Sequence, residues 1–439
     1  MKIVRYSLIV LTLSLMFAVL TEAVGPEKPK EGRIFYVRQT VGNDSNDGLS
    51  PQKAWQSLSK LEKTMLAGDT AYVGPGLYRE MITVANSGTP ETWITFIGDM
   101  TGEHTGDPPG IVLITGADSM DETAFVPQST PGLYKADNFQ DHSLRLVEMD
   151  GPQYRYKNAA DTPEHLREGE PLLEVVARLE STYHYDRDTG GLYIHTSDGL
   201  PPSSHEIEVV RRNYGIVTYG NHHISVSGFT FRHMGIAGIN FGKSSSNCVA
   251  LNNTSYGSWQ GIRVSDSSNV RVEGNTLFRN GNSGVYFLSK SRNGQAVRNI
   301  AYQNAKGVRW SSASEKGVAL ENVTFENHEG GISIENTNEI SISNNIMVNN
   351  KISQLLVRKS SYTSQANCYE KGSVEQFIAK VDFYESYKTL AEYQQATNQD
   401  LSSREECGQL PQKIDVHELH RQTTAYAEHA RKILAAHGK

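Results

Sequence analysis

Three side chains that can bind an anion or transfer a proton are spaced at a fixed interval in the second half of the chain. Arg263, Tyr286 and Arg309 follow one another at intervals of 23 residues. Guanidinium groups bind carboxylates in a bidentate manner, and a sugar carboxylate neutralised in this way makes the adjacent C–H group more acidic. A base can then remove that proton, and a phenol can act as this base or as the acid toward the leaving oxygen. The three residues therefore predict cleavage of an acidic sugar chain by β-elimination.

Other residues of the same region can assist this chemistry. Lys290 follows Tyr286 by four positions and joins the two arginines and the tyrosine as a candidate for proton transfer. Polar and aromatic side chains nearby are candidates for contacting the substrate, and these are Asn240, Trp259, His233, Glu335 and Asp266.

A repeat determines how these residues are placed. Glycines recur at spacings of 23, 23, 23 and 24 residues, at Gly238, Gly261, Gly284, Gly307 and Gly331. Each is followed by an apolar, a variable and an apolar residue, and a sixth copy without the glycine is Leu355-Leu356-Val357. A fixed period of this length indicates a solenoid, and alternation with period two indicates strands. We therefore predict an all-β fold, a right-handed parallel β-helix with regular coils at 224–361.

The phase of the repeat separates an inward from an outward column. Coils stack at roughly 4.8 Å, so residues of equal phase lie above one another. The second residue after each glycine should point outward, in a row formed by Asn240, Arg263, Tyr286, Arg309, Ser333 and Leu356. Asparagines at 253, 275, 299, 322 and 345 predict an amide ladder in a turn. The aromatic residues Tyr256, Phe278, Tyr302 and Phe325 are predicted to stack in the core.

The N-terminus and the charge balance indicate the compartment and the partners. Lys2 and Arg5 precede an apolar run at 8–20, and small residues at 21–23 offer a cleavage site. This pattern predicts a signal peptide at 1–23, a secreted or periplasmic location, and no membrane contact after cleavage. A net charge of −7 without a basic tract excludes nucleic acid as the expected partner. We expect a monomer whose partner is a polysaccharide.

The three cysteines leave one question open. Cys248 lies at an apolar phase of a coil and is predicted to be a buried thiol. Cys368 and Cys407 lie in the C-terminal part, and the sequence leaves open whether they pair. A CxxC motif or a Cys/His cluster is absent from the sequence, so no metal or other cofactor is expected, and calcium is not indicated.

The remaining segments are assigned around the regular coils. Residues 24–110 are predicted to form an N-terminal cap and the first coils, with a helix at 55–66. Residues 111–205 interrupt the period and are predicted to form a strand-rich insertion with a hairpin at 183–202. The β-helix coils as a whole are assigned to 206–361, and the six copies of the repeat lie at 224–361 within them. The C-terminal cap and tail at 362–439 should be irregular at 362–384 and helical at 387–397 and 416–436, covering the open sheet edge.

The first coils carry a family resemblance. The segments "FYV…GNDSNDGLSPQKAWQSLSKL…GDTAYVGPGLYRE…SGTPETWITFIGD" resemble the opening of secreted right-handed parallel β-helix proteins of the pectate-lyase-like superfamily. That superfamily contains polysaccharide lyases, some glycoside hydrolases and uronan epimerases. The resemblance implies the fold, the N-terminal cap, the insertion and the tail, but it does not specify the reaction. It also implies that a lyase of this kind would use Lys or Arg as the base on the outward face.

Departures from the superfamily narrow the choice of reaction. The regular coils contain only Asp266, whereas calcium-dependent pectate lyases present clusters of Asp, and the Asp-Pro-His motif of the epimerases is absent. Hydrolysis requires two carboxylates at most about 9.5 Å apart, whereas Asp266 and Glu335 should lie three coils, or roughly 14 Å, apart. Pairing of Glu335 with Glu329 or Glu326 stays open. A polysaccharide lyase is the favoured function, and the alternatives are a glycoside hydrolase and a non-catalytic glycan-binding solenoid.

Overall fold

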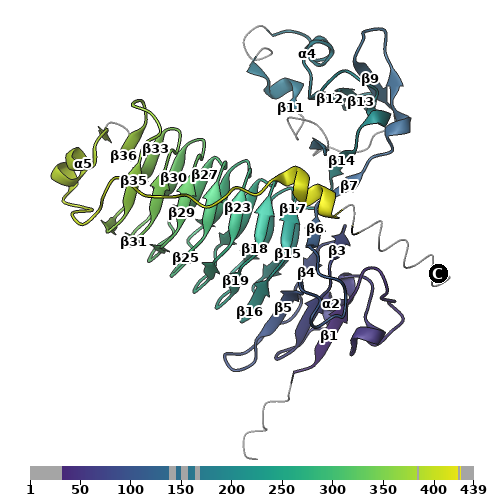
Figure 1. Ribbon diagram of the computed structural model, residues 1–439, viewed down its shortest axis with the longest axis horizontal. Coiled ribbons are helices and arrows are strands. Elements are labelled where there is room, and N and C mark those ends of the chain that lie inside the picture. Colours follow the sequence, from purple (N-terminus) through teal and green to yellow (C-terminus); the bar gives the residue numbers. More distant parts are fainter. Residues whose placement is uncertain are drawn as a thin grey trace, which may run out of the picture.

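The computed structural model describes residues 32–137, 145–149, 157–163, 169–382, 385–423 and 426. The signal peptide predicted at 1–23 lies outside these residues. Within them, three long sheets wind around one core as a right-handed parallel β-helix, with the strands of successive coils side by side (Figure 1). The predicted fold class, and the fold implied by the family resemblance, are confirmed.

Sheet A forms one side of the solenoid. Its ten strands are β1 (Ile34–Val37), β2 (Thr70–Val73), β5 (Ile94–Gly98), β16 (Ile224–Ser227), β19 (Val249–Leu251), β22 (Arg271–Glu273), β25 (Gln295–Val297), β28 (Val318–Leu320), β31 (Ile340–Ser343) and β34 (Tyr362–Gln365).

Sheet B forms the second side. Its nine strands are β3 (Gly76–Tyr78), β6 (Val112–Thr115), β17 (Thr230–Arg232), β20 (Thr254–Tyr256), β23 (Thr276–Phe278), β26 (Ile300–Tyr302), β29 (Val323–Phe325), β32 (Ile346–Val348) and β35 (Cys368–Glu370).

Sheet C forms the third side and contains the glycine repeat. Its strands are β4 (Ile82–Thr83), β15 (Tyr214–Tyr219), β18 (Ala237–Gly242), β21 (Gln260–Ser265), β24 (Ser283–Leu288), β27 (Lys306–Ser311), β30 (Gly330–Glu335), β33 (Ser353–Arg358), β36 (Phe377–Val381) and β37 (Glu385–Tyr387). All neighbours in it are parallel except β36 and β37. The coil formed by β34, β35 and β36 continues the regular array, where the sequence predicted irregular structure at 362–384.

Alternation along the strands of sheet C fixes the inward and outward columns. In β21, Ile262 and Val264 are fully buried in the core, and Arg263 between them points to the other face. The register aligns Ile262 with Ile239 above it and with Val285 below it. The predicted phases of the repeat are therefore confirmed on this sheet.

Two amide ladders hold the coils in register. In the predicted ladder, Asn275 Nδ2 donates to Asn299 Oδ1 at 2.9 Å, and the next step is the same. A second ladder, which the sequence analysis missed, occupies the turns between sheets B and C and consists of Asn280, Asn304, Asn327 and Asn350. Each amide also donates to a backbone carbonyl of a neighbouring coil, as Asn275 does to Ala250. A slip of one coil would break these bonds together.

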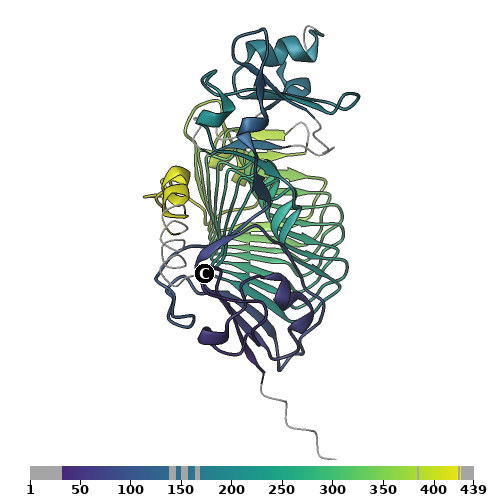
Figure 2. The same cartoon turned by 90° about the vertical axis from the view of Figure 1, so that its right-hand side faces the viewer.

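The aromatic column does not lie in the core as predicted. Tyr256, Phe278, Tyr302 and Phe325 stack with ring centroids 4.9–5.0 Å apart, but on the outward face of sheet B. They form a separate apolar cluster with residues of the C-terminal segment 404–423, which we call the strap. The strap returns from the last coil toward the first coils along this face, as the yellow trace shows (Figure 1), and its helical end lies outside one side of the solenoid (Figure 2).

Both ends of the solenoid are closed by short helices. Helix α2 (Ser59–Thr64), shorter than the predicted 55–66, places Leu58 and Leu61 in the core at the N-terminal end. Helix α5 (Leu390–Thr397), shorter than the predicted 387–397, begins with a capping box and buries Leu390 and Tyr393 at the other end. The described part of the tail is helical at 416–423.

The structure shows the bonding state of each of the three cysteines. Cys368 in β35 and Cys407 at the start of the strap form a disulfide, so the open question is answered by pairing. Cys248 is the buried thiol that was predicted, and burial raises its pKa to about 12.

The excursion between the early and the regular coils forms two small sheets. The first contains β7 (Ala117–Ser119), β10 (Leu146–Glu148) and β14 (Ile207–Val210); the second contains β8 (Val126–Pro127), β9 (Leu133–Ala136), β11 (Lys157–Asn158), β12 (Thr182–Asp186) and β13 (Gly191–His195), with helix α4 (Leu172–Arg178) packed on it. Strands β12 and β13 form the hairpin predicted at 183–202. Short 3₁₀ helices are η1 (Pro51–Lys53), η2 (Glu122–Ala124), η3 (Ala159–Asp161) and η4 (Pro202–Ser204).

The boundaries of the excursion differ from the predicted 111–205. Strand β6 belongs to the β-helix, and β14 pairs antiparallel with β7 and β10 rather than with a coil. The excursion therefore extends from β7 to β14, and it projects from one end of the solenoid (Figure 1).

Candidate functional site

The predicted outward row lies on sheet C in continuous register. Asn240, Arg263 and Tyr286 are aligned partners on β18, β21 and β24, and the row continues through Arg309 to Ser333. Adjacent members are separated by one coil, roughly 4.8 Å. The sequence placed these side chains together because period and alternation alone fix a column in a solenoid.

Tyr286, Arg309 and Glu335 form one connected cluster in this row. The guanidinium carbon of Arg309 lies 4.6 Å from the centroid of the Tyr286 ring. Arg309 Nη2 donates to Glu335 Oε2 at 2.9 Å, and its Nη1 donates to Asn282 Oδ1 at 3.3 Å. The Tyr286 hydroxyl is hydrogen-bonded to Ser311 Oγ at 2.7 Å. Arg309 is thus an ion-paired group that holds the tyrosine ring.

The electrostatics of this cluster keep Glu335 ionised. Burial alone would raise the pKa of Glu335, but the positive charges of Arg309 and Lys306 outweigh burial and hold the pKa below its usual value. Lys306 itself forms an ion pair with Glu329 on the next coil. The carboxylates on this part of the sheet are therefore matched by cations.

Arg263 differs from Arg309 in how it is held. Its Nη1 and Nη2 donate to Gln260 Oε1 at 3.3 Å and to Ser265 Oγ at 3.4 Å, both long hydrogen bonds to neutral groups. The side chain is half-buried, and among the residues that the structure describes it has no carboxylate partner. Arg263 is thus a half-buried positive charge on the outward face, held only loosely by the neighbours that the structure describes.

Lys290 and Asp266 lie beyond the strand ends, in the turns that leave sheet C. Both are exposed and adopt positive φ, 66° and 51°. Asp266 accepts a hydrogen bond of 3.4 Å from Ser244 Oγ. These two residues therefore border the face rather than stand within the row.

Asn240 and Trp259 lie at the end of the row nearest the excursion. Asn240 is 3% exposed although its phase points outward. The Trp259 ring is 41% exposed, and the guanidinium carbon of Arg145 from the excursion lies 5.8 Å from its centroid. The excursion thus reaches the edge of this face.

The prediction that His233 contacts substrate is wrong. Its side chain is fully buried, and its Nδ1 lies 3.1 Å from Glu208 Oε2. Glu208 also accepts from Arg232 and Arg79, each at 2.9 Å. Burial would raise the pKa of Glu208, but Arg232, His233 and Arg79 together lower it strongly. This network is a structural connection between the excursion and the first coils.

The carboxylates on sheet C do not form a pair suited to glycoside hydrolysis. Glu329 directly precedes strand β30, and Glu335 is the last residue of that strand. Six residues of extended chain separate them, which corresponds to roughly 20 Å between their backbone positions. Asp266 and Glu335 are separated by three coils, as the register shows. Both are separations of backbone positions, and both exceed the roughly 5–9.5 Å that the two hydrolytic geometries require between the carboxyl groups.

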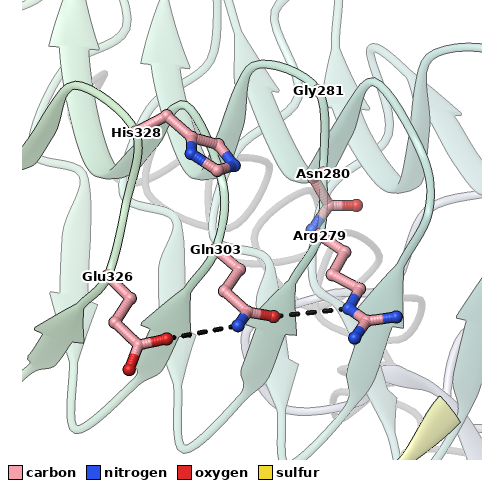
Figure 3. Close-up of a pocket in the computed structure, with 6 residues that line it drawn as sticks. All are labelled: Arg279, Asn280, Gly281, Gln303, Glu326 and His328. Atoms are coloured by element: carbon pink, nitrogen blue, oxygen red, sulfur yellow. Dashed lines mark hydrogen bonds between the residues drawn. The ribbon is translucent and has the colours of Figure 1, made fainter. Parts of the chain in front are cut away.

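Glu326 lies outside this face, in a separate pocket of about 430 Å³ on the turns between sheets B and C (Figure 3). Arg279 Nε donates to Gln303 Oε1 at 3.3 Å, and Gln303 Nε2 donates to Glu326 Oε2 at 3.2 Å. Lys413 of the strap pairs with Glu326 at 2.5 Å, and His328 projects above this row (Figure 3). In the sequence, Arg279, Gln303 and Glu326 each come directly after a residue of the aromatic column, and this shared position was the signal that could have found them.

Comparisons with known proteins support the fold. A family model described as "Periplasmic copper-binding protein (NosD)" matches residues 179–373. No curated protein sequence matches the chain. The solved structure of XylC with xylose is 13% identical, with a TM-score of 0.54, and the match covers 80% of this chain and 72% of that chain.

Two further solved structures match the chain at lower scores. A rhamnogalacturonan lyase is 10% identical, with a TM-score of 0.45 and coverage of 88% of this chain and 90% of that one. The pectate lyase Pel9A is 13% identical, with a TM-score of 0.43 and coverage of 80% and 79%. At 13% identity, the likeness to the XylC structure shows the fold alone.

The copper of the matched family's description finds no suitable donors in the matched segment. Copper sites use His, Cys and Met ligands that converge. Within the described residues, no three His, Cys, Asp or Glu side chains are arranged to hold a metal ion. Cys248 is sequestered in the core and His233 is bound to Glu208. The described His, Cys, Asp and Glu residues therefore do not provide such a site. A helix long and apolar enough to cross a membrane is likewise not found in the described part of the chain.

Proposed function

We propose that this chain is a secreted or periplasmic carbohydrate-active protein that binds a uronate-containing polysaccharide on the outward face of sheet C and cleaves it by β-elimination. The observation that carries the proposal is Arg263, a half-buried guanidinium bound only by long hydrogen bonds to neutral groups. It stands one coil from the Tyr286–Arg309–Glu335 cluster. A carboxylate bound there would form charge-assisted, bidentate hydrogen bonds.

The arrangement can perform elimination as follows. Arg263 binds the carboxylate of one uronate residue and stabilises the charge that develops when the C5 proton leaves. Tyr286, on the next coil, or Lys290 at the edge of the face accepts that proton. The electrons of the C5–H bond form the C4–C5 double bond, the C4–O bond breaks, and the departing oxygen takes a proton from Tyr286, which either received it from C5 or carries its own phenol proton while Lys290 is the base. Arg309 is committed to Glu335, so its role is to position the Tyr286 ring.

Elimination and hydrolysis leave different products, and this separates them. The protein is incubated with polygalacturonate and with alginate, and the ultraviolet absorbance of the new C4–C5 double bond is followed. Rising absorbance supports the proposal. New reducing ends without absorbance would indicate hydrolysis, and binding without either product would indicate a glycan-binding solenoid.

Variants test the assignment of residues. Arg263→Ala and Lys290→Ala should each lower turnover by about ten-fold or more, because a hydrogen bond to a charged group is worth roughly 1.5–3 kcal/mol. The melting temperature should stay near that of the wild type, since neither side chain packs in the core. Arg292→Ala is a matched control, because that arginine is exposed and pairs with Glu315 away from sheet C. Wild-type turnover in both site variants would contradict the assignment.

A further inference from the structure

A polar pocket on the turns between sheets B and C takes no part in the proposed elimination. Its volume of about 430 Å³ falls within the roughly 300–1,000 Å³ of sites for small molecules. The side chains of Arg279, Gln303 and Glu326 form one row in it, and His328 stands above the row (Figure 3). Arg279 and His328 are exposed, and Gly281 lines the pocket without a side chain. The pocket is therefore open to solvent, and a ligand can reach its charged groups.

The three residues of the row occupy equivalent positions on successive coils. Each directly follows a residue of the aromatic column, and that column is in register from Phe278 through Tyr302 to Phe325. Adjacent residues of the row are therefore one coil, roughly 4.8 Å, apart. The row carries a positive charge at Arg279 and a negative charge at Glu326, two coils or roughly 10 Å away.

The strap neutralises the negative end of this row. Lys413 Nζ lies 2.5 Å from Glu326 Oε2, and the same oxygen accepts a hydrogen bond of 3.2 Å from Gln303 Nε2. The other oxygen, Oε1, is accessible to solvent and takes no hydrogen bond from the residues that the structure describes. Glu326 thus keeps one acceptor that a hydroxyl group of a ligand can use.

Gln303 fixes the direction of the guanidinium group at the other end. Because its Nε2 donates to Glu326, its Oε1 faces the opposite way and accepts from Arg279 Nε at 3.3 Å. The two terminal nitrogens of Arg279 make no hydrogen bond within the described part of the chain. A planar guanidinium held at Nε presents these two nitrogens as a fork, which suits the oxygens of a carboxylate or a sulfate group.

Other exposed arginines of the coils are paired with carboxylates. Arg298 has nearly the same backbone conformation as Arg279, with φ of 51° against 52°, and it forms ion pairs with Glu273 and Glu321. Arg292 pairs with Glu315. Carboxylates are in excess in a chain with a net charge of −7, yet Arg279 has none as a partner among the described residues.

We propose that this pocket binds a monoanionic sugar, whose carboxylate or sulfate group binds the fork of Arg279 and whose hydroxyl groups donate to Glu326 Oε1. A bare anion would use Arg279 alone, whereas the pocket extends over two coils and offers an acceptor at its far end. A second negative charge on the ligand would meet the carboxylate of Glu326, which is unfavourable. The site goes beyond the proposed function, because it lies outside the outward face of sheet C and uses none of the residues assigned to elimination.

The test records the pocket directly. Full-length protein with isotopically labelled arginine is titrated with galacturonate, with sulfated galactose, with galactose and with inorganic sulfate. The Nε–H signal of Arg279, identified by its absence in Arg279→Gln, is followed by NMR. The better of the two anionic sugars should half-saturate the shift at a concentration at least ten-fold below that of galactose and of inorganic sulfate. Comparison of the two anionic sugars distinguishes a carboxylate from a sulfate ester as the group that Arg279 takes.

Two variants assign the binding to this row. Gln303→Glu places a carboxylate beside Arg279 and should weaken the binding of the anionic sugar at least ten-fold, because the fork then has a partner within the chain and the ligand is repelled. Arg298→Gln is the matched control, since that arginine lies on the turns between sheets A and B, and it should titrate like the wild type. Wild-type affinity in Gln303→Glu would overturn the proposal.

The outcomes separate this pocket from the proposed function. Elimination on polygalacturonate without a shift of the Arg279 signal by either anionic sugar would overturn the pocket and leave the proposed function standing. A saturable shift in a protein that eliminates nothing would support the pocket and contradict the proposed function. Equal affinities for an anionic sugar and inorganic sulfate, or for an anionic sugar and galactose, would overturn the assignment of a monoanionic sugar.

Discussion

Sheets B and C present outward columns of side chains from the same coils, but the strap covers only the column on sheet B. On sheet B the column is a stack of aromatic rings that the strap covers, and Phe278 is fully buried there. On sheet C the corresponding column is mainly polar: Asn240, Tyr286 and Ser333 are buried among their neighbours, Arg263 is half-buried, and Trp259 is exposed at the edge. A solenoid thus offers equivalent surfaces on each side, and side-chain chemistry decides which one the chain uses for its own packing.

The strap covers sheet B rather than sheet C because the two columns differ in what their removal from water costs. Leu410, Ile414 and Leu419 of the strap pack on the aromatic rings, and Ile414 N donates to the Tyr302 hydroxyl at 2.9 Å. Burial of apolar surface stabilises this contact at about 25 cal/mol per Å². Covering Arg263 in the same way would bury a charge for which the described chain provides no carboxylate, which is strongly unfavourable. The strap consequently lies on the apolar face and leaves Arg263 uncovered.

The largest effect is expected from the aromatic stack. Phe278→Ala removes a buried ring whose centroid is 5.0 Å from those of both Tyr256 and Tyr302. It should lower the free energy of unfolding by about 3–5 kcal/mol, as measured by denaturant titration, without affecting activity on polygalacturonate. Arg263→Ala should instead lower the activity on polygalacturonate and leave the free energy of unfolding nearly unchanged. Similar losses of stability in both variants would remove the contrast between the two faces.

An intermediate effect is expected from the strap's covalent attachment. The Cys368–Cys407 disulfide closes a segment with a sequence separation of 39 residues. In the double variant Cys368→Ser/Cys407→Ser, the free energy that holds the strap on sheet B should fall by about 3–4 kcal/mol, because the cross-link is lost. The backbone amide hydrogens at 404–423 should therefore exchange faster with solvent.

The wild type treated with a reductant is the control for that variant and should behave in the same way. Amides in β21 and β24 on sheet C should keep their protection in both samples. Faster exchange on both sheets would mean that the strap stabilises the whole solenoid uniformly rather than one face.

The smallest effect is expected from the ion pair on sheet C. The pKa of Glu335 is lowered from its usual value of 4.5, since the charges of Arg309 and Lys306 outweigh burial. The ionised group therefore contributes stability above about pH 4.5, and this contribution is lost as the pH falls through the lowered pKa. Between pH 7 and pH 3 the wild type should lose about 1 kcal/mol more than Glu335→Gln. Parallel pH profiles would show that the ion pair contributes nothing.

The sequence determined much of this architecture because period and phase suffice in a solenoid. The glycine spacing placed Arg263, Tyr286 and Arg309 in one row, and the register bears this out. The asparagine ladder through Asn275 was found for the same reason. The second ladder had an equally regular signal, since Asn280, Asn304, Asn327 and Asn350 are spaced by 24, 23 and 23 residues, and it was overlooked.

The location of the aromatic column could not be obtained in this way. Strand β23 has only three residues, and Leu277 and Phe278 are both apolar, so alternation does not say which one faces the core. The answer depends on the strap, whose residues lie more than 100 positions further along the chain and carry no repeat. His233 was misplaced for a similar reason, because its partner Glu208 comes from the excursion.

The path of the strap has a consequence for how the molecule unfolds. In a repeat protein each coil contacts only its neighbours, so the last coil can detach while the others stay folded. Here the strap is joined to the last sheet B strand by Cys407, crosses β26 at Ile414, and reaches Glu206, where His420 Nε2 lies 2.8 Å from Oε2. Its two ends therefore join the last coil to the excursion, so fraying of the last coil also pulls on the contacts that the strap makes on sheet B. On the sheet B side, the strap therefore couples the last coil to coils that it does not itself contact.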